Sequence, residues 1–141
     1  MPNFIVKTHK QNVIYSDYRI FILNKGLNSG KPRKEPFANS FVIIVPNQDD
    51  FETVYWLAYS LWKSNYWHIS LCGSVIPFLR IGEFKKNFIP KITKLLSDCK
   101  QHQKHVDALR LLEKQEQHFQ NNLTLINELR RTILHNYINH L

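Results

Sequence analysis

The sequence has few of the residues that mark secreted, metal-binding or repetitive proteins. Two cysteines, Cys72 and Cys99, are too few for a disulfide framework, and no CxxC pair predicts a zinc ribbon or a redox centre. Four glycines and six prolines among 141 residues exclude collagen-like and low-complexity sequence. No apolar run approaches the roughly 18 residues that cross a bilayer, and the N-terminal residues do not resemble a signal peptide. We therefore expect a cytoplasmic protein with no membrane partner.

Glycine, proline and most aromatic residues are also missing from the last third of the chain. Every glycine and proline lies at or before Pro90, as do 16 of the 18 aromatic residues. A hydrophobic content of 43% is too high for a disordered chain. We predict an α+β fold: a small mixed head over residues 1–90, a candidate recognition domain, followed by a long helix or helical hairpin. Residues 91–141 form this tail, a candidate dimerisation or coiled-coil segment.

Within the head, β-branched and aromatic runs predict strands at residues 4–6, 18–23 and 40–45, the last one buried. Asp49 and Asp50 suit the N-terminus of a helix over residues 51–63, because acidic side chains favour the positive end of the helix dipole. Further along, the pattern predicts a strand at 68–71, extended chain at 75–81 and a short helix or turn at 81–86.

The tail has apolar residues at alternating steps of three and four, which predicts a helix. The series consists of Ile92, Leu95, Cys99, His102, Val106 and Leu109, and then of Phe119, Leu123, Ile126, Ile133 and Tyr137. The polar residues 113–118 interrupt it, so the tail is either one long helix or two helices that fold back near Asn121 and Asn122. One helix would extend about 75 Å and would need a partner helix, from a second copy or another protein.

The net charge of +8 suggests an acidic partner, and DNA is our leading candidate. Residues 1–48 carry a net +5, densest in the segment 25–34 around Gly26 and Gly30. We expect backbone N–H groups and basic side chains of this loop to contact phosphates, with amide and hydroxyl side chains contacting bases or sugars. The candidate contacts are Lys25, Asn28, Ser29, Lys31, Arg33 and Lys34, with Arg80, Lys85 and Lys86 as a second basic cluster.

The same loop superficially resembles a nucleotide-binding phosphate loop. That motif has four residues between its glycines and Ser or Thr after the lysine, whereas here three residues separate Gly26 from Gly30 and Pro32 follows Lys31. The mismatch argues against a nucleotide site. The simplest alternative to a phosphate-contacting loop is a solvated turn between two strands.

Residues with catalytic or metal-binding chemistry are scattered. Cys72 and Ser74 near His68 are the one compact nucleophile set, but no nucleophile elbow surrounds Ser74. His102 and His105 lie one helical turn apart, but a metal needs a third ligand as well. We therefore expect a non-enzymatic protein without a metal or another cofactor.

An aromatic segment lies between residues 55 and 67, with three tryptophans and three tyrosines. Such side chains can stack on unpaired bases. Core packing is the alternative that we favour, because helical spacing places Tyr55, Tyr59 and Trp62 on one face, which we expect to be buried.

Two resemblances appear in these residues. The chain resembles an uncharacterised family of short Bacteroidetes proteins in the segments Phe21–Pro32, Val54–Leu57, Leu61–Trp62 and Gly73–Ile81, which implies no activity. The order of elements is similar to the target recognition domain and following helix of type I restriction specificity subunits. That likeness implies DNA recognition by the head and pairing of the long helix. It would place Gly73 and Ser74 in a loop near the end of the domain, and Ile89 and Pro90 at the junction with the helix.

The sequence thus leaves two functions open. One is a non-enzymatic DNA-binding module that resembles a restriction specificity recognition domain. The other is a protein-interaction adaptor that oligomerises through its C-terminal helix. Salt-dependent DNA binding would support the first, and the size of the protein in solution tests the pairing that the second requires.

Overall fold

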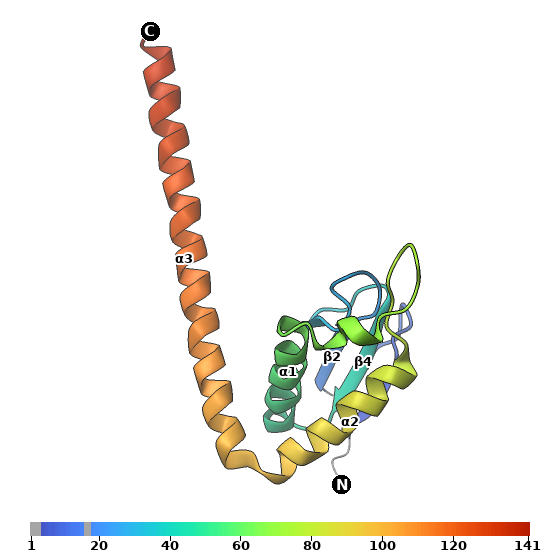
Figure 1. Ribbon diagram of the computed structural model, residues 1–141. Coiled ribbons are helices and arrows are strands. Elements are labelled where there is room, and N and C mark those ends of the chain that lie inside the picture. Colours follow the sequence, from blue (N-terminus) through green and yellow to red (C-terminus); the bar gives the residue numbers. More distant parts are fainter. Residues whose placement is uncertain (1–3, 16–17) are drawn as a thin grey trace. The chain divides into compact units, whose positions relative to one another are not determined.

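The computed structural model describes residues 4–15 and 18–141, without the side chains of Cys99 and Gln101. The Cys99 position in the predicted apolar series therefore lies outside the described side chains. The elements, in chain order, are β1 (Ile5–Thr8), β2 (Tyr18–Leu23), β3 (Pro32–Arg33), β4 (Ser40–Val45), α1 (Gln48–Lys63), the 3₁₀ helix η1 (Tyr66–Ser70), α2 (Ile81–Ser97) and α3 (Cys99–Asn139). This order confirms a mixed α+β fold with a long C-terminal helix (Figure 1).

The four strands form one antiparallel sheet in the order β1-β4-β2-β3. The central strands β2 and β4 pair along their whole length, with Ile20 opposite Ile43. These are the two strands whose apolar runs predicted them most clearly. Successive side chains of a strand point to opposite faces, so each run supplies residues to both faces of the sheet.

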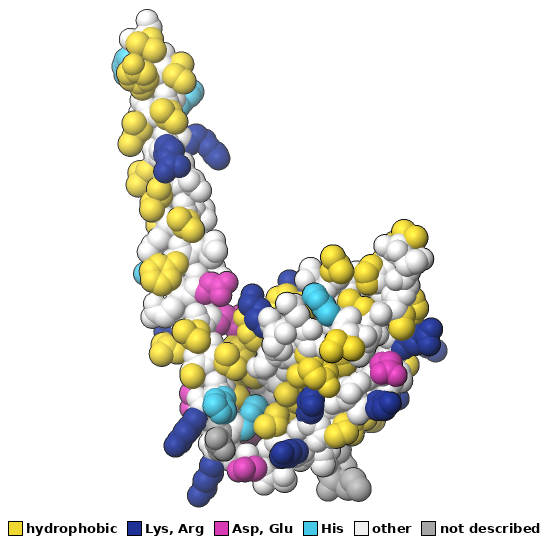
Figure 2. Space-filling model, viewed as in Figure 1, with side chains coloured by type: hydrophobic (Ala, Val, Ile, Leu, Met, Phe, Trp, Pro, Cys, Tyr) yellow, Lys and Arg dark blue, Asp and Glu magenta, His cyan; other side chains and the backbone are white. Residues whose placement is uncertain are grey.

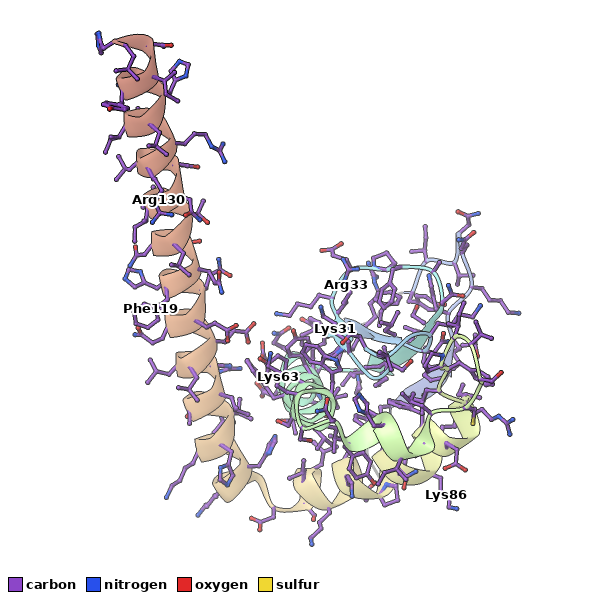
Figure 3. The ribbon with its side chains drawn as sticks, turned by 45° about the horizontal axis from the view of Figure 1, so that its top comes forward. Lys31, Arg33, Lys63, Lys86, Phe119 and Arg130 are labelled. Atoms are coloured by element: carbon purple, nitrogen blue, oxygen red, sulfur yellow. The ribbon has the colours of Figure 1, made fainter. Side chains whose placement is uncertain are left out.

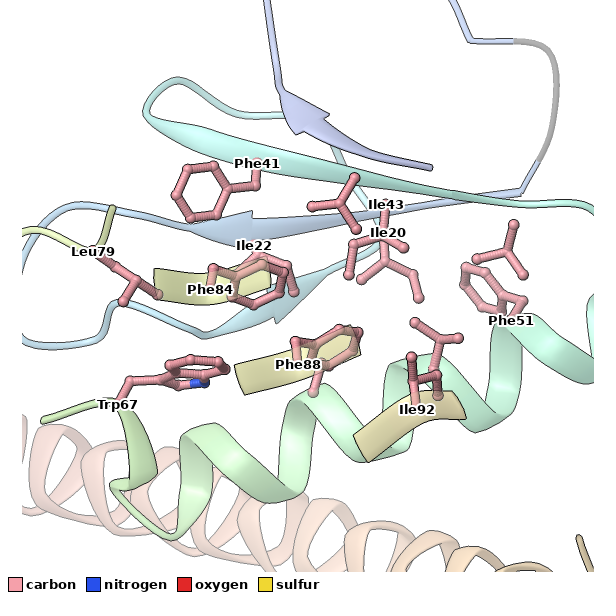
Figure 4. Close-up of a cluster of buried hydrophobic side chains, with 14 residues drawn as sticks. Ile20, Ile22, Phe41, Ile43, Phe51, Trp67, Leu79, Phe84, Phe88 and Ile92 are labelled. Carbon is pink, nitrogen blue, oxygen red and sulfur yellow. The ribbon is translucent and has the colours of Figure 1, made fainter. Parts of the chain in front are cut away.

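One face of the sheet packs against α1 and α2 and forms the main core (Figure 4). The strands contribute Ile20, Ile22, Phe41, Ile43 and Val45 to this core. The opposite face has a smaller cluster of Tyr15, Phe21 and Val42, against which Phe37 packs. Both faces of β2 and β4 are therefore covered, which explains why these strands read as nearly continuous apolar runs.

Helix α1 begins where the sequence predicts a helix N-terminus. Asn47 is the N-cap, and its side-chain oxygen accepts a hydrogen bond from the Asp50 N–H at 2.8 Å. The acidic residues Asp49 and Asp50 lie in the first turn, where the helix dipole favours them. Val54 and Ala58 face the sheet and are almost fully buried.

Helix α2 is longer than the short helix or turn predicted for residues 81–86. It continues through Pro90 to Ser97, and Phe84, Phe88 and Ile92 on its inner side are completely buried in the main core. Proline has no N–H, so Pro90 cannot donate the usual helical hydrogen bond to the Lys86 carbonyl. Pro90 lies on the exposed side of α2, where water can bond to this carbonyl instead. The apolar series that begins at Ile92 therefore starts in the core and not in an exposed tail.

The strand predicted for residues 68–71 is wrong, because the chain there forms η1. Asn65 has a φ of 59°, a left-handed conformation that asparagine tolerates, and it lies between α1 and η1. The tight turn places Trp67 in the core with 1% of its surface exposed. Trp67 is thus the buried residue of η1, whereas Ile69 is 96% exposed.

Residues 91–97 of the predicted tail belong to α2, and the rest forms one helix, because α3 continues without a break from Cys99 to Asn139. It passes through Asn121 and Asn122, where a turn was one of the two predictions. By its internal contacts the chain divides into two compact units, residues 1–103 and 104–141. The second unit is a single helix.

Candidate nucleic-acid interface

The glycine-bounded loop 24–31 is tightly tied between β2 and β3. The Gly30 N–H donates to the Leu23 carbonyl at 2.7 Å, and the Leu23 N–H donates to the Lys31 carbonyl at 3.0 Å. Gly26 and Gly30 have φ angles of 89° and 98°, which L side chains rarely adopt. Both glycines are therefore required by the path of the chain, independently of any ligand.

The loop uses much of its polar backbone internally. The N–H groups of Ser29 and Lys31 donate to carbonyls of the loop itself, and that of Gly26 donates to the Pro77 carbonyl. The Ser29 hydroxyl is buried and donates to the Gly26 carbonyl at 2.7 Å. Together with that of Gly30, these N–H groups are occupied within the fold and are not free to bind a phosphate. The side chains of Lys25 and Asn28 are exposed and stay candidates for contacts with an anion.

The same loop lies beside the segment that leads into α2. Lys25 and Phe78 form an antiparallel bridge, and the Leu79 N–H donates to the Asn24 carbonyl at 2.9 Å. The Arg80 guanidinium lies over the Phe78 ring, 5.9 Å from its centroid. The fold therefore brings Lys25 of the first predicted cluster close to Arg80 of the second, although 54 residues separate them in sequence.

Three lysines lie over aromatic rings of α1. The Nζ atoms of Lys31 and Lys63 are each 5.1 Å from the centroid of the Trp62 ring. Lys34 Nζ is 5.1 Å from the Tyr55 ring centroid and 5.8 Å from that of Phe51. We call Lys31, Lys34 and Lys63 with Phe51, Tyr55 and Trp62 the lysine–aromatic surface.

The ammonium groups of this surface are not neutralised by carboxylates. Among the described residues, no Asp or Glu oxygen lies within 4.0 Å of the ammonium groups of Lys31, Lys34 or Lys63. The ion pair that those residues do contain joins Arg110 to Asp107 in α3. Cation–π attraction holds an ammonium group in place without cancelling its charge. In the described part of the chain, these lysines are therefore held over aromatic rings and not in ion pairs.

The other predicted basic residues point elsewhere. Arg33 pairs with Phe21 in the sheet register and lies 5.0 Å from the Phe37 ring, on the face opposite the helices. Lys34 is the next residue and faces α1, as strand alternation requires. Lys85 and Lys86 are exposed on α2, and Figure 3 shows Lys86 well apart from the labelled Lys31 and Lys63.

The aromatic face of α1 differs from the prediction. Tyr55, Tyr59 and Trp62 are half-buried, while Val54 and Ala58 make the buried contact with the sheet. The Tyr59 and Trp62 ring centroids are 5.7 Å apart in an edge-on arrangement. The buried positions of α1 are instead those of Phe51, Val54, Trp56 and Ala58, while Tyr55 packs against the edge of the core.

Lys63 is the residue that sequence reasoning missed. It was not included because it lies 29 residues after Lys34 and outside the basic loop. The available signal was its position in the last turn of a helix, directly after an aromatic residue. Only the packing of the loop against the end of α1 brings Lys31 and Lys63 to the same ring.

The residues considered for catalysis lie in η1 and in the loop that follows it. His68 is exposed on η1, Ser74 is exposed in the following loop, and the Cys72 thiol donates to the Ser70 carbonyl at 3.7 Å. Within residues 4–15 and 18–141, no three His, Cys, Asp or Glu side chains are placed to hold a metal ion. In the same part of the chain, no helix is both long and apolar enough to span a membrane.

The family assignment comes from a match over most of the chain. A model of the family of unknown function DUF6943 matches residues 6–136. The chain belongs to this family. No curated protein and no solved structure matches it. The DUF6943 match agrees with the resemblance to an uncharacterised family, whereas the bacterial source and the likeness to restriction specificity subunits stay predictions.

Proposed function

We propose that this DUF6943 protein is a non-enzymatic module that binds DNA through its lysine–aromatic surface. The observation that supports the proposal is the convergence of Lys31 and Lys63 on Trp62, each 5.1 Å from the ring centroid, with no carboxylate of the described residues beside them. Neither ammonium group is paired with a carboxylate, so each can donate charge-assisted hydrogen bonds to an anion that approaches the end of α1.

A phosphate of a nucleic-acid backbone suits this arrangement. Binding a phosphate to lysines releases the counterions condensed on DNA, which favours association at low salt. Lys34 adds a third cation along the same helix, and the half-buried Trp62 ring supplies a surface on which an unpaired base can stack. The surface thus combines charge with aromatic area, as in many nucleic-acid-binding proteins.

The remaining predicted contacts divide by position. Lys25 and Arg80 lie beside Phe78, and Asn28 is exposed in the loop, so these three extend the proposed interface. The buried hydroxyl of Ser29 is left out of it. Contacts of DNA with Arg33, Lys85 and Lys86 stay predictions. They require a DNA that is long enough to reach other faces of the head. Likewise, the likeness to a restriction specificity recognition domain remains a proposal about architecture.

The proposal is tested by fluorescence anisotropy with a labelled DNA duplex at a salt concentration of about 50 mM. The variant Lys31→Gln/Lys63→Gln is compared with Lys85→Gln/Lys86→Gln, which removes the same charge from α2. We expect roughly tenfold or greater weakening of binding for the first variant and a much smaller loss for the second. Absence of binding by the unchanged protein, or equal losses in the two variants, contradicts the proposal. A single-stranded probe of the same length shows whether stacking contributes.

The alternative is a protein-interaction adaptor that acts through α3. It is favoured by the large apolar side chains on this helix, among which Phe119, Ile133 and Tyr137 are exposed by 61% or more. Monomeric soluble proteins rarely expose so continuous an apolar surface. An adaptor would bind a partner through α3 and would not lose that binding when Lys31 and Lys63 are changed.

A further inference from the structure

The second half of α3 exposes an unusually apolar surface. Figure 2 shows hydrophobic side chains along much of this helix. The exposed large apolar residues from position 111 onward are Leu111, Leu112, Phe119, Leu123, Leu125, Ile126, Leu129, Ile133, Leu134, Tyr137, Ile138 and Leu141. Many of them are leucine or isoleucine, which prefer the inside of proteins. This surface has the composition of an interface.

Some of these residues form a regular seam along the helix. Leu112, Phe119, Leu123, Ile126, Ile133 and Tyr137 occupy the a and d positions of one heptad frame. The frame extends over nearly four heptads, or about 38 Å at 1.5 Å per residue. Repeats of this length are typical of coiled coils. Two a positions of the same frame are charged, Glu116 and Arg130.

We propose that α3 pairs with α3 of a second copy of this chain, in antiparallel orientation. In the register that we infer, Leu123 packs opposite Ile126 of the second copy. In this register Glu116 lies in the core layer next to that of Arg130 of the second copy. Arg130 of the first copy likewise lies next to the layer of Glu116 of the second copy. Because two-fold symmetry repeats the contact, the only charges in the apolar seam form two opposite-charge pairs.

Parallel pairing with a second copy is disfavoured by the same two residues. In a parallel coiled coil, equivalent a positions face each other, so Glu116 would meet Glu116 and Arg130 would meet Arg130. Like charges at such positions destabilise the pair and suppress that orientation. Charge complementarity therefore selects both the occupant and its direction.

The residues that flank Arg130 support burial of its side chain. Leu129 and Leu134 occupy the g and e positions around it and are exposed in the single chain. In the proposed pair they cover the aliphatic part of Arg130, while its guanidinium reaches Glu116 of the second copy. In the single chain the Arg130 guanidinium donates a long hydrogen bond, 3.4 Å, to the Asn127 side chain.

The test measures the molar mass of the full chain by light scattering and sedimentation equilibrium over a series of concentrations. The variants are Glu116→Lys, Arg130→Glu and the double exchange of both. The matched controls are Glu128→Lys and Arg131→Glu, which make the same changes at exposed positions outside the seam. Circular dichroism checks that each variant retains its helix content.

We expect a dimer whose dissociation constant rises about tenfold or more in each single seam variant and returns toward the original value in the double exchange. The controls should leave dissociation nearly unchanged. A monomer at all concentrations overturns the inference. Single variants that dimerise as well as the unchanged chain also overturn it. Such a result fits parallel pairing, in which Glu116→Lys only replaces a contact between two glutamates by a contact between two lysines. DNA binding does not enter this test, so its result is independent of the function proposed above.

Discussion

Gly30 lies against the indole of Trp67 so closely that a Cβ atom at position 30 would be 2.2 Å from Trp67 Cδ1. The contact joins the basic loop to the most deeply buried side chain of the 3₁₀ helix. The next residue, Lys31, reaches the Trp62 ring at the end of α1. Packing of the core and the position of a candidate binding lysine thus depend on the same glycine.

Gly30→Ala should therefore destabilise the protein by about 2–4 kcal/mol, because the added methyl group overlaps Trp67 and the φ of 98° strains any L residue. Gly26→Ala is the matched control, since Gly26 also has a positive φ but no atom within 4 Å of a built Cβ. We expect Gly26→Ala to lose only about 1 kcal/mol. Urea unfolding measures both, and equal losses would show that the contact with Trp67 is unimportant.

Phe88→Ala tests whether α2 belongs to the core of the head. Phe88 is completely buried and stacks on Phe84, with ring centroids 4.9 Å apart. Removing its ring should lower the free energy of unfolding by about 3–5 kcal/mol. The neighbouring Ile89 is exposed, so Ile89→Ala should cost less than about 1 kcal/mol. A small effect of Phe88→Ala would argue against the observed packing of α2.

Asn47→Ala removes the N-cap of α1. The variant loses the 2.8 Å hydrogen bond from the Asp50 N–H, so the free energy of unfolding should fall by about 1 kcal/mol. Asn47→Asp retains an acceptor at the same place and should recover most of the loss. Thermal unfolding of the three proteins distinguishes loss of the cap from a general effect of substitution.

The salt dependence of DNA binding provides a separate measure of the lysine–aromatic surface. If Lys31 and Lys63 each neutralise one phosphate, Lys31→Gln/Lys63→Gln should make the slope of log binding constant against log salt concentration less steep by roughly 2. A weaker binding constant with an unchanged slope would mean that these lysines support the structure without contacting phosphates. Anisotropy titrations at four or more salt concentrations give the slope.

Much of the head could be predicted from local pattern. Strands β2 and β4 have the predicted bounds, because their β-branched and aromatic runs are bordered by turn residues. The N-terminus of α1 followed from Asp49 and Asp50 next to an apolar helical series. These features depend on neighbours in sequence, which is why reading the chain residue by residue finds them.

The candidate site was only partly predictable. The basic loop could be named, but the internal use of its N–H groups and of Ser29 could not, since those bonds depend on the turn that Gly26 and Gly30 permit. The contribution of Lys63 depends on two segments packing together. Similarly, the prediction of a strand at residues 68–71 was wrong, because burying the Trp67 side chain outweighs the local β propensity.

The sequence by itself determined strands β2 and β4, the N-terminus of α1, the concentration of charge in one loop and the apolar period of the tail, because each depends on neighbouring residues. Only the tertiary structure decided that Pro90 lies within a core helix, that α3 has no turn at Asn121 and Asn122, and that Lys31 and Lys63 share Trp62. The physical reason is that burial is a property of the whole fold. Which side of a helix is covered, and which cations remain without a carboxylate, depends on contacts between residues far apart in the chain.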